Sequence, residues 1–219
     1  MVTAEITITR EDLLKFTQPM QYIGIDWETY DAISEELGNS SPIHLSYEKG
    51  ILTVMPLTKL HETLVRLLER LLGIVSLVTR SEILPTGSAT IRSKSRLIGV
   101  EPDLSFFVTN VDSARLKAFV PDETDLPPDI VVEIDITYTS EKKIDIYSQL
   151  GVPEFWLYDG EILKMFRLQD NDRYLQVERS SELPMLTSEE LTEFLRRAQN
   201  DEEQFKLLVD FQELLQNAK

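Results

Sequence analysis

The residues of this sequence best suited to chemistry are two carboxylates on an otherwise apolar stretch. Over 129–136 the side chains alternate, so that Glu133 and Asp135 are predicted to share one face of a strand while the other face is apolar. Side chains two residues apart on a strand lie roughly 7 Å from each other. Carboxylates at that spacing repel each other unless a cation lies nearby. The pattern therefore favours a site that binds a positive group.

Two neighbouring stretches carry groups that can join these acids. A strand is predicted over 99–108, with Asp103 on one of its faces. A helix is predicted over 140–150, and it places Lys143 and Tyr147 four residues apart on one side. Two acid-bearing strands and a lysine-bearing helix are therefore expected to converge.

This set of groups suits metal-dependent hydrolysis of a phosphodiester. Hard cations such as Mg²⁺ bind carboxylate, carbonyl and water oxygens, and Asp103, Glu133 and the carbonyl of Ile134 would supply part of that shell. Water on such an ion loses a proton more easily, and the ion offsets charge on a phosphate during in-line displacement. Lys143 would orient the water or stabilise the phosphorus transition state. The expected cofactor is Mg²⁺ or Mn²⁺, whereas Ser/His/Asp catalysis, a phosphate-cradling glycine loop and a nicotinamide fingerprint are not indicated.

Each of these residues also has a structural interpretation. Asp103 could cap a turn, and Glu133 could pair with Lys143 as a half-buried ion pair. Asp135 could end its strand in solvent. Taken one at a time, the structural interpretation is favoured. Taken together, the functional one is, because alternate acids on an apolar strand are a costly way to build a core.

The composition suits a single domain with additional elements. The chain has 219 residues, of which 42% are hydrophobic, enough for a core. It has no cysteine, which excludes disulfide bonds and thiolate metal sites and fits a reducing compartment. No apolar run is long enough to span a membrane, and the first residues lack the basic head and apolar core of a signal peptide. We therefore expect a cytoplasmic protein that does not enter a membrane.

Basic residues gather in one segment of an otherwise acidic chain. The net charge is −16, which argues against indiscriminate attraction to nucleic acid. Over 56–97, however, seven basic and three acidic residues give a local balance of +4, so the remainder carries −20. Three of these basic residues alternate on a predicted strand and are candidates for nucleic-acid binding: Arg92, Lys94 and Arg96. Ordinary solvated charges explain the same pattern equally well.

The other predicted elements surround these stretches. The longest is a helix over 60–78 with an apolar stripe, and His61 lies at the edge of that stripe. A lone histidine there is usually structural, although it could contact a substrate or a metal. Helices are also predicted over 9–18, 27–37, 113–119, 188–198 and 202–216, and strands over 44–56 as a hairpin, 82–84 paired with 89–94, 153–158, 162–168 and 174–177. The expected fold class is α/β, a mixed sheet flanked by helices, and the last amphipathic helix either packs on the body or joins subunits.

The motifs themselves resemble a known family. EPD, a strand of form VVEIDIT, a helix of form KxxxY and then GVPEFW are similar to the Uma family, once filed as domain of unknown function 820, in the PD-(D/E)xK nuclease superfamily. The resemblance covers about Trp27 to Arg167, including the HE pair at His61. It implies a restriction endonuclease-like domain over 1–185 and a C-terminal helical extension over 186–219.

The resemblance also implies roles for the residues at the centre. Pro102 and Asp103 match the PD half of the motif, and Glu133 matches the second acid. The superfamily pattern has a lysine two residues later, where this chain has Asp135, and in the similar branch the lysine lies on the next helix, at Lys143. Three residues are expected to support this set: His61, Asp135 and Tyr147.

Two functions are compatible with this resemblance. The first is a Mg²⁺-dependent endonuclease that hydrolyses phosphodiester bonds of DNA, working as a homodimer because duplex cleavage needs two sites related by a two-fold axis. The alternative is a catalytically inactive nuclease-like scaffold that serves as a nucleic-acid-binding or protein-interaction module. The net charge of −16 and the acid at Asp135 favour the alternative.

Overall fold

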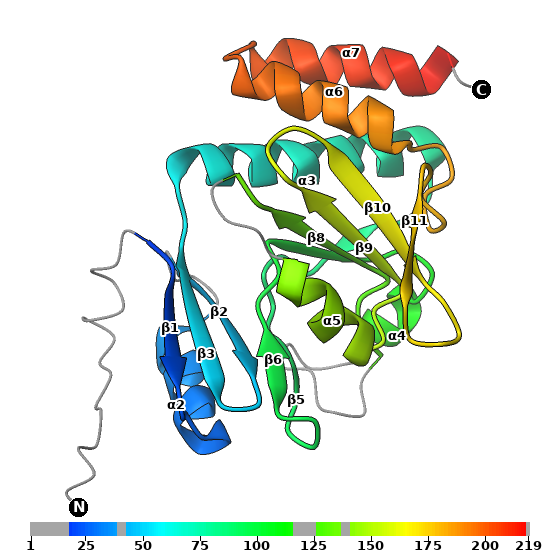
Figure 1. Cartoon of the computed structure of the whole chain (residues 1–219). Helices are drawn as coiled ribbons and strands as arrows, with labels where there is room; N and C mark the ends of the chain where they lie inside the picture. Colours follow the sequence, from blue (N-terminus) through cyan, green and yellow to red (C-terminus); the bar gives the residue numbers. More distant parts are fainter. Residues whose placement is uncertain (1–17, 39–42, 116–125, 137–140, 218–219) are drawn as a thin grey trace, which may run out of the picture.

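Two β-sheets and six helices make up the described part of the chain, which comprises residues 18–38, 43–115, 126–136 and 141–217 of a computed structural model. The first sheet occupies the lower left of Figure 1 and the second the upper right, with helices against both. The α/β class with helices flanking sheet is confirmed, but the single mixed sheet expected from the sequence is in fact two sheets.

The first sheet is antiparallel throughout and has the order β1-β3-β2-β6-β5. Its strands are β1 (Met20–Ile23), β2 (Ile43–Glu48), β3 (Ile51–Pro56), β5 (Ile91–Ser93) and β6 (Ile98–Val100). Strands β2 and β3 form the predicted hairpin, and its turn residues Lys49 and Gly50 both have positive φ, as tight hairpin turns require.

Helix α2 (Trp27–Leu37) packs on the first sheet, and its bounds are those expected from the sequence. Asp26 caps it by accepting a 2.8 Å hydrogen bond from the Thr29 amide, and Gly38 ends it at a φ of 62°. Its apolar face meets the sheet through aromatic contacts among Trp27, Tyr30 and Tyr47. These aromatic residues therefore pack a core and do not form a ligand cage.

The second sheet has the order β11-β10-β9-β8-β7-β4 and contains one parallel pair, β8 with β9. Its strands are β4 (Leu84–Pro85), β7 (Leu104–Phe107), β8 (Ile130–Ile134), β9 (Glu154–Tyr158), β10 (Leu163–Leu168) and β11 (Tyr174–Val177). The chain returns from β8 to β9 through helix α5 (Glu141–Gln149), because parallel neighbours need a crossover. Helix α5 therefore starts close to where β8 ends.

Helix α3 (Lys59–Thr79) lies along the second sheet and carries the centre of the main core (Figure 1). Thr58 caps it, and most of the predicted apolar stripe is buried, although Leu60 at its start is 41% exposed. Leu64, Leu68 and Leu71 pack with Leu104, Val132 and other residues of the second sheet. The first turn of α3 follows directly from β3, so it lies where the two sheets meet.

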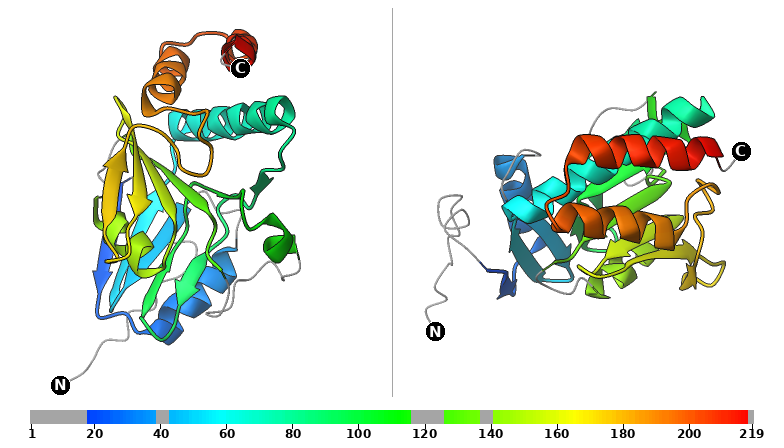
Figure 2. Two further views of the ribbon diagram at one scale, coloured as in Figure 1. Left: turned by 90° about the vertical axis from the view of Figure 1, so that its right-hand side faces the viewer. Right: turned by 90° about the horizontal axis from the view of Figure 1, so that it is seen from above.

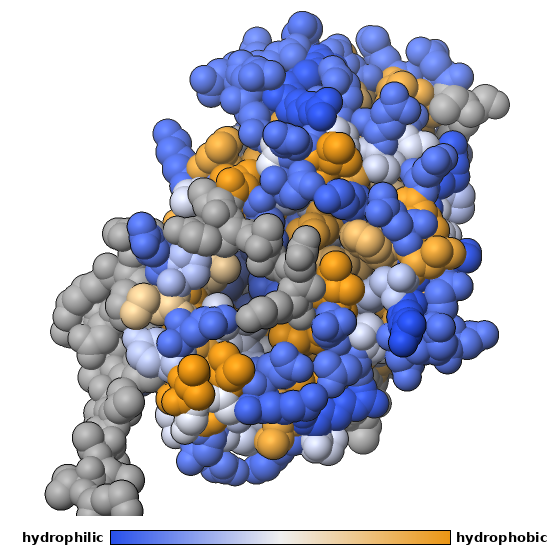
Figure 3. All heavy atoms as spheres, in the orientation of Figure 1, coloured by the Kyte–Doolittle hydropathy of each residue, from blue (hydrophilic) through white to orange (hydrophobic). Residues whose placement is uncertain are grey.

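The C-terminal helices α6 (Ser188–Gln199) and α7 (Gln204–Asn217) lie over α3 (Figure 2). Leu195, Leu207 and Phe211 enter the same core as α3, so the amphipathic tail packs on the body. Hydrophilic residues dominate the outer side of this layer in the view of Figure 3. The predicted division into a domain over 1–185 and an extension over 186–219 stays a prediction.

The single strand predicted over 99–108 is wrong, because the chain changes sheets within it. Strand β6 ends at Val100 in the first sheet, and β7 starts at Leu104 in the second. Pro102 has no amide to donate, and the carboxylate of Glu101 accepts a 2.8 Å hydrogen bond from the Leu45 amide. The ladder is therefore interrupted, and Asp103 lies at the crossing between the sheets.

The predicted pairing of 82–84 with 89–94 is also wrong. Strand β4 pairs with β7 and β5 pairs with β6, so the two stretches belong to different sheets. The turn between them is bound to β7, because the Thr86 amide donates to the Ser105 carbonyl at 2.9 Å and the Ser105 hydroxyl donates to the Gly87 carbonyl at 2.8 Å.

Two predicted helices remain to be placed. The helix expected over 9–18 lies almost wholly outside the described residues. The one expected over 113–119 is found as α4 (Val111–Arg115), and 116–119 lie outside the described residues. Within the described ranges, none of the helices has the length and apolar character that crossing a bilayer requires.

Candidate active site

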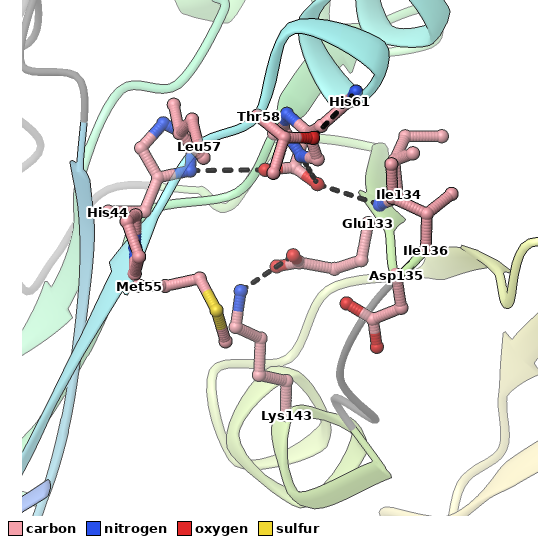
Figure 4. A pocket seen from close by; sticks show the side chains of 12 residues that line it. His44, Met55, Leu57, Thr58, His61, Glu133, Ile134, Asp135, Ile136 and Lys143 are labelled. Atoms are coloured by element: carbon pink, nitrogen blue, oxygen red, sulfur yellow. Dashed lines mark hydrogen bonds and ion pairs between the residues drawn. The ribbon is translucent and has the colours of Figure 1, made fainter. Parts of the chain in front are cut away.

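A small pocket lies where the two sheets meet the starts of α3 and α5 (Figure 4). Its volume is about 30 Å³, enough for a single ion or a water molecule. Twelve residues line it, among them His44, Met55, His61, Asp103, Glu133, Asp135 and Lys143. The three groups that the sequence predicted to converge, Asp103, Glu133 and Lys143, therefore do share one pocket.

Asp103 is held from several sides at the crossing between the sheets. One oxygen, Oδ2, accepts a 2.7 Å hydrogen bond from the Ile134 amide and lies 2.9 Å from His61 Nε2. The other, Oδ1, lies 3.1 Å from His44 Nδ1. Burial opposes ionisation, but the two imidazoles and the charge of Lys143 outweigh it and hold the pKa of Asp103 far below its usual range. Asp103 is therefore a buried carboxylate anion.

His61 reaches Asp103 from the first turn of α3. Its backbone amide is bound to the Thr58 hydroxyl, so the helix cap fixes where the side chain starts. Its second ring nitrogen, Nδ1, lies 3.6 Å from Glu62. Burial disfavours the charged ring, but the hydrogen bond and charge of Asp103 outweigh it, so the pKa of His61 is raised above 6.5. His61 therefore lines the pocket, and its contact with a substrate or a metal stays a prediction.

Glu133 is bound by two side chains of α5. Lys143 Nζ lies 2.6 Å from Glu133 Oε2, and the Tyr147 hydroxyl donates to Oε1. Burial raises the pKa of Glu133 to about 7, with Asp103 adding to the rise and Lys143 opposing it. The pKa of Lys143 is itself raised, because Glu133 and Asp103 outweigh its burial. Lys143 and Tyr147 lie on one side of α5, as their four-residue spacing predicted, and the structure shows that both bind the same carboxylate.

The donor chemistry of the pocket fits a hard divalent cation. Among the described residues no three His, Asp or Glu side chains are arranged to hold an ion together. Mg²⁺, however, is commonly bound by one or two carboxylates and completes its shell with water and carbonyl oxygens. Asp103 and Glu133 supply the carboxylates, and the positive groups of His61 and Lys143 balance their charge.

Stability is expected to fall as pH rises from about 5 to 8. The folded-state pKa of Glu133, about 7, lies above its ordinary 4.5, so the folded protein binds more protons than the unfolded chain in that window. The raised pKa of His61 acts in the same direction, and Asp103 acts oppositely only below about pH 4. The unfolding free energy, measured by urea denaturation at each pH, should therefore decline between pH 5 and 8. In Glu133→Gln this decline should be smaller by about 1–3 kcal/mol.

The matched control for this pH experiment is Glu213→Gln, an exposed acid on α7. It tests whether loss of any carboxylate from this acidic chain flattens the profile. An unchanged slope in Glu133→Gln, or an equal change in Glu213→Gln, would contradict the assignment to the pocket.

Asp135 also lines the pocket, whereas the acid at the start of the same strand does not. Asp129 Oδ2 accepts hydrogen bonds of 2.7–2.9 Å from the amides of Val108, Thr109 and Asn110. Asp129 therefore holds the loop that leads into α4. The acidic face predicted for this strand divides into a structural acid and the pocket acids.

The basic residues proposed to contact nucleic acid lie away from the pocket. Arg92 pairs with Asp31, and Lys94 Nζ lies 3.3 Å from Glu28, so both are bound to acids of α2. Arg96 is exposed in the turn between β5 and β6. None of the three lines the pocket. Their role in nucleic-acid binding remains a prediction.

His44 is the ionisable pocket residue that was not predicted from the sequence. It lies on β2 and pairs with Met55 of β3. The alternating pattern of this hairpin marks it only as a strand residue. A signal was nevertheless available, because the chain contains two histidines and both line this pocket.

Comparisons with known proteins agree with the geometry. The family model “Uma2: Putative restriction endonuclease” matches residues 27–199. The chain is similar to the crystal structure of a putative nuclease belonging to DUF820 from Anabaena variabilis, with 16% identity, coverage of 75% of this chain and 97% of that chain, and a TM-score of 0.51. It also matches the type IIG restriction endonuclease BpuSI, with 15% identity, coverage of 72% of this chain and 16% of that chain, and a TM-score of 0.34. No curated protein matches the chain.

The match extends further along the chain than the sequence motifs indicated. The motifs ended near Arg167, whereas the family model continues to residue 199 and so includes α6. The structural match to the DUF820 protein supports the same fold. Because the family model covers most of the chain, the protein belongs to the Uma2 family of restriction endonuclease-like proteins.

Proposed function

We propose that this protein is a metal-dependent endonuclease that hydrolyses phosphodiester bonds of DNA. One observation carries the proposal: Asp103, Glu133 and Lys143 come from a sheet crossing, a strand and a helix, yet line one pocket. Asp103, Glu133 and the carbonyl of Ile134 would hold Mg²⁺ or Mn²⁺. When bound, such an ion supplies an activated water and charge stabilisation at phosphorus.

The side chains of the pocket have defined tasks in this proposal. Lys143 reaches the pocket from α5, and its ammonium group can donate a hydrogen bond to a phosphate oxygen or to the attacking water. Glu133 has a pKa of about 7, so it can hold or release a proton near neutral pH. Tyr147 donates to Glu133 and so fixes the orientation of its carboxyl group. His61 and Asp135 complete the supporting set.

For duplex DNA as substrate, we propose that the protein acts as a homodimer. We also propose that it acts in the cytoplasm. In a dimer with a two-fold axis, each of the two sites would cut one strand of the duplex. The basic segment that includes Arg92, Lys94 and Arg96 would contact the DNA backbone. Because Arg92 and Lys94 are paired with acids of α2, this contact requires the phosphates to displace those acids.

A nuclease-like scaffold without activity is the second candidate. Specific contacts favour it: Lys143 and Tyr147 already bind Glu133, and His61 and the Ile134 amide already bind Asp103. A cation must compete with these partners. The acid at Asp135 and the net charge of −16 point the same way.

Cleavage assays on supercoiled plasmid and on single-stranded DNA and RNA separate the two candidates. The nuclease proposal expects nicked or linear product in Mg²⁺ or Mn²⁺ and none in EDTA. The scaffold expects intact substrate in every metal, together with no heat of Mn²⁺ binding by calorimetry. Product that forms equally in EDTA would contradict the metal-dependent proposal.

A further inference from the structure

His44 has a ring nitrogen that the described chain leaves unsatisfied. The residue is 8% exposed, and its Nδ1 has no hydrogen-bond partner. A buried polar atom without a partner is costly, so such atoms usually have a function or a missing partner. Nδ1 lies 3.1 Å from Asp103 Oδ1, but it is not aligned with that oxygen as a hydrogen bond requires.

The two oxygens of Asp103 differ in what is left for another partner. Oδ2 is bound by the Ile134 amide and by His61 Nε2, which occupy the acceptor positions of that oxygen. Oδ1 has the unaligned contact with His44, and both residues line the pocket. Among the described residues, the lone pairs of Asp103 that remain for another partner are therefore those of Oδ1, beside the unsatisfied nitrogen of His44.

A separation of 3.1 Å suits either a hydrogen bond or two ligands of one ion, and the missing alignment favours the ligands. Ligand atoms at about 2.1 Å from an octahedral ion lie about 3 Å apart when they are adjacent. Adjacent ligands direct their lone pairs at the ion and not at each other, so the missing alignment is expected of such a pair.

We propose that His44 Nδ1 and Asp103 Oδ1 together bind the divalent cation, so that the site has a nitrogen ligand. The inference rests on the proposed metal-dependent function and adds a nitrogen ligand to it. Because no three His, Asp or Glu side chains of the described residues are arranged around one ion, Glu133 would have to move to join His44 and Asp103 on it. His61 is a positioning residue in this arrangement, since its Nε2 is used to hold Asp103. Imidazole suits first-row transition metals better than Mg²⁺. The site should therefore prefer Mn²⁺ or Co²⁺ to Mg²⁺.

Pulsed electron paramagnetic resonance of the Mn²⁺-loaded full chain tests the ligand directly. A coordinated imidazole couples its ¹⁴N nucleus to the manganese electrons, and we expect that coupling in the wild type. It should be lost in His44→Leu and in His44→Asn, the second variant keeping a polar group if the first fails to fold. The matched control is His61→Asn, which should keep the coupling because it removes the other histidine and retains a donor to Asp103.

Calorimetry gives an independent measure of the same ligand. In His44→Asn the ratio of Mn²⁺ to Mg²⁺ affinity should fall by about tenfold or more. Mn²⁺ bound without nitrogen coupling, or a coupling that survives in both His44 variants, would overturn the ligand assignment while leaving the proposed nuclease intact. No Mn²⁺ binding by the wild type would overturn both.

Discussion

Asp103→Asn is expected to lower plasmid cleavage by a factor of about 1,000 or more. Asparagine keeps the shape of the side chain, and its carbonyl oxygen can still accept the Ile134 amide. It removes the negative charge that a cation needs, and several kcal/mol of charge stabilisation correspond to about three powers of ten in rate. The measurement is the rate of nicking of supercoiled plasmid in Mn²⁺ and in Mg²⁺.

Loss of activity must be distinguished from loss of folding. Asp112→Asn is the control for a carboxylate far from any site, since its side chain is 99% exposed on α4. It should cut at the wild-type rate. Thermal unfolding followed by circular dichroism should show that Asp103→Asn is folded at the assay temperature. Wild-type cutting by Asp103→Asn would remove this residue from the site.

Most helices and the two hairpins could be predicted because their signals are local. Helix α2 has a capping aspartate at Asp26 and a stop at Gly38, and α3 has an uninterrupted apolar stripe. The turn at Asp159 and Gly160 joins β9 to β10 as its sequence predicts. Each of these elements is determined by residues within about four positions of each other.

The crossing at Asp103 could not be predicted in the same way. Strand alternation continues on both sides of Pro102, so the pattern does not show that β6 and β7 pair in different sheets. The choice depends on partners that are distant in sequence, such as Glu101 with Leu45. The same crossing brings Asp103 to His44, which explains why the sequence missed that histidine.

The charge of the basic segment over 56–97 also depends on residues that are distant in sequence. The local balance of +4 over 56–97 counts charges along the chain, whereas neutralisation depends on neighbours in space. Arg92 meets Asp31 from 61 positions away. This pair is only partly buried, and ion pairs near the surface contribute little to stability. They do, however, reduce the positive field that a composition argument had assigned to the surface.

Lys143→Met is expected to reduce cleavage by a factor of about 100 to 1,000 while leaving metal binding intact. Methionine has a similar length and suits the buried position, but it has no charge and no donor for a phosphate oxygen or water. Loss of Lys143 leaves Glu133 with its hydrogen bond from Tyr147, so its carboxylate can bind the cation against less competition. We therefore expect unchanged or tighter Mn²⁺ binding by calorimetry, together with a lower kcat.

The two variants should therefore differ in metal binding. Asp103→Asn should lose both metal binding and cleavage, whereas Lys143→Met should lose cleavage alone. The fold should survive Lys143→Met, since a Glu133 carboxyl with a pKa of about 7 can take up a proton when its partner is removed. Lys206→Met on α7 is the control, because its side chain is 62% exposed and pairs only with Glu202 among the described contacts. Full activity of Lys143→Met would remove the displaced-lysine assignment, whereas loss of Mn²⁺ binding would make Lys143 a structural partner of Glu133 and no part of the chemistry.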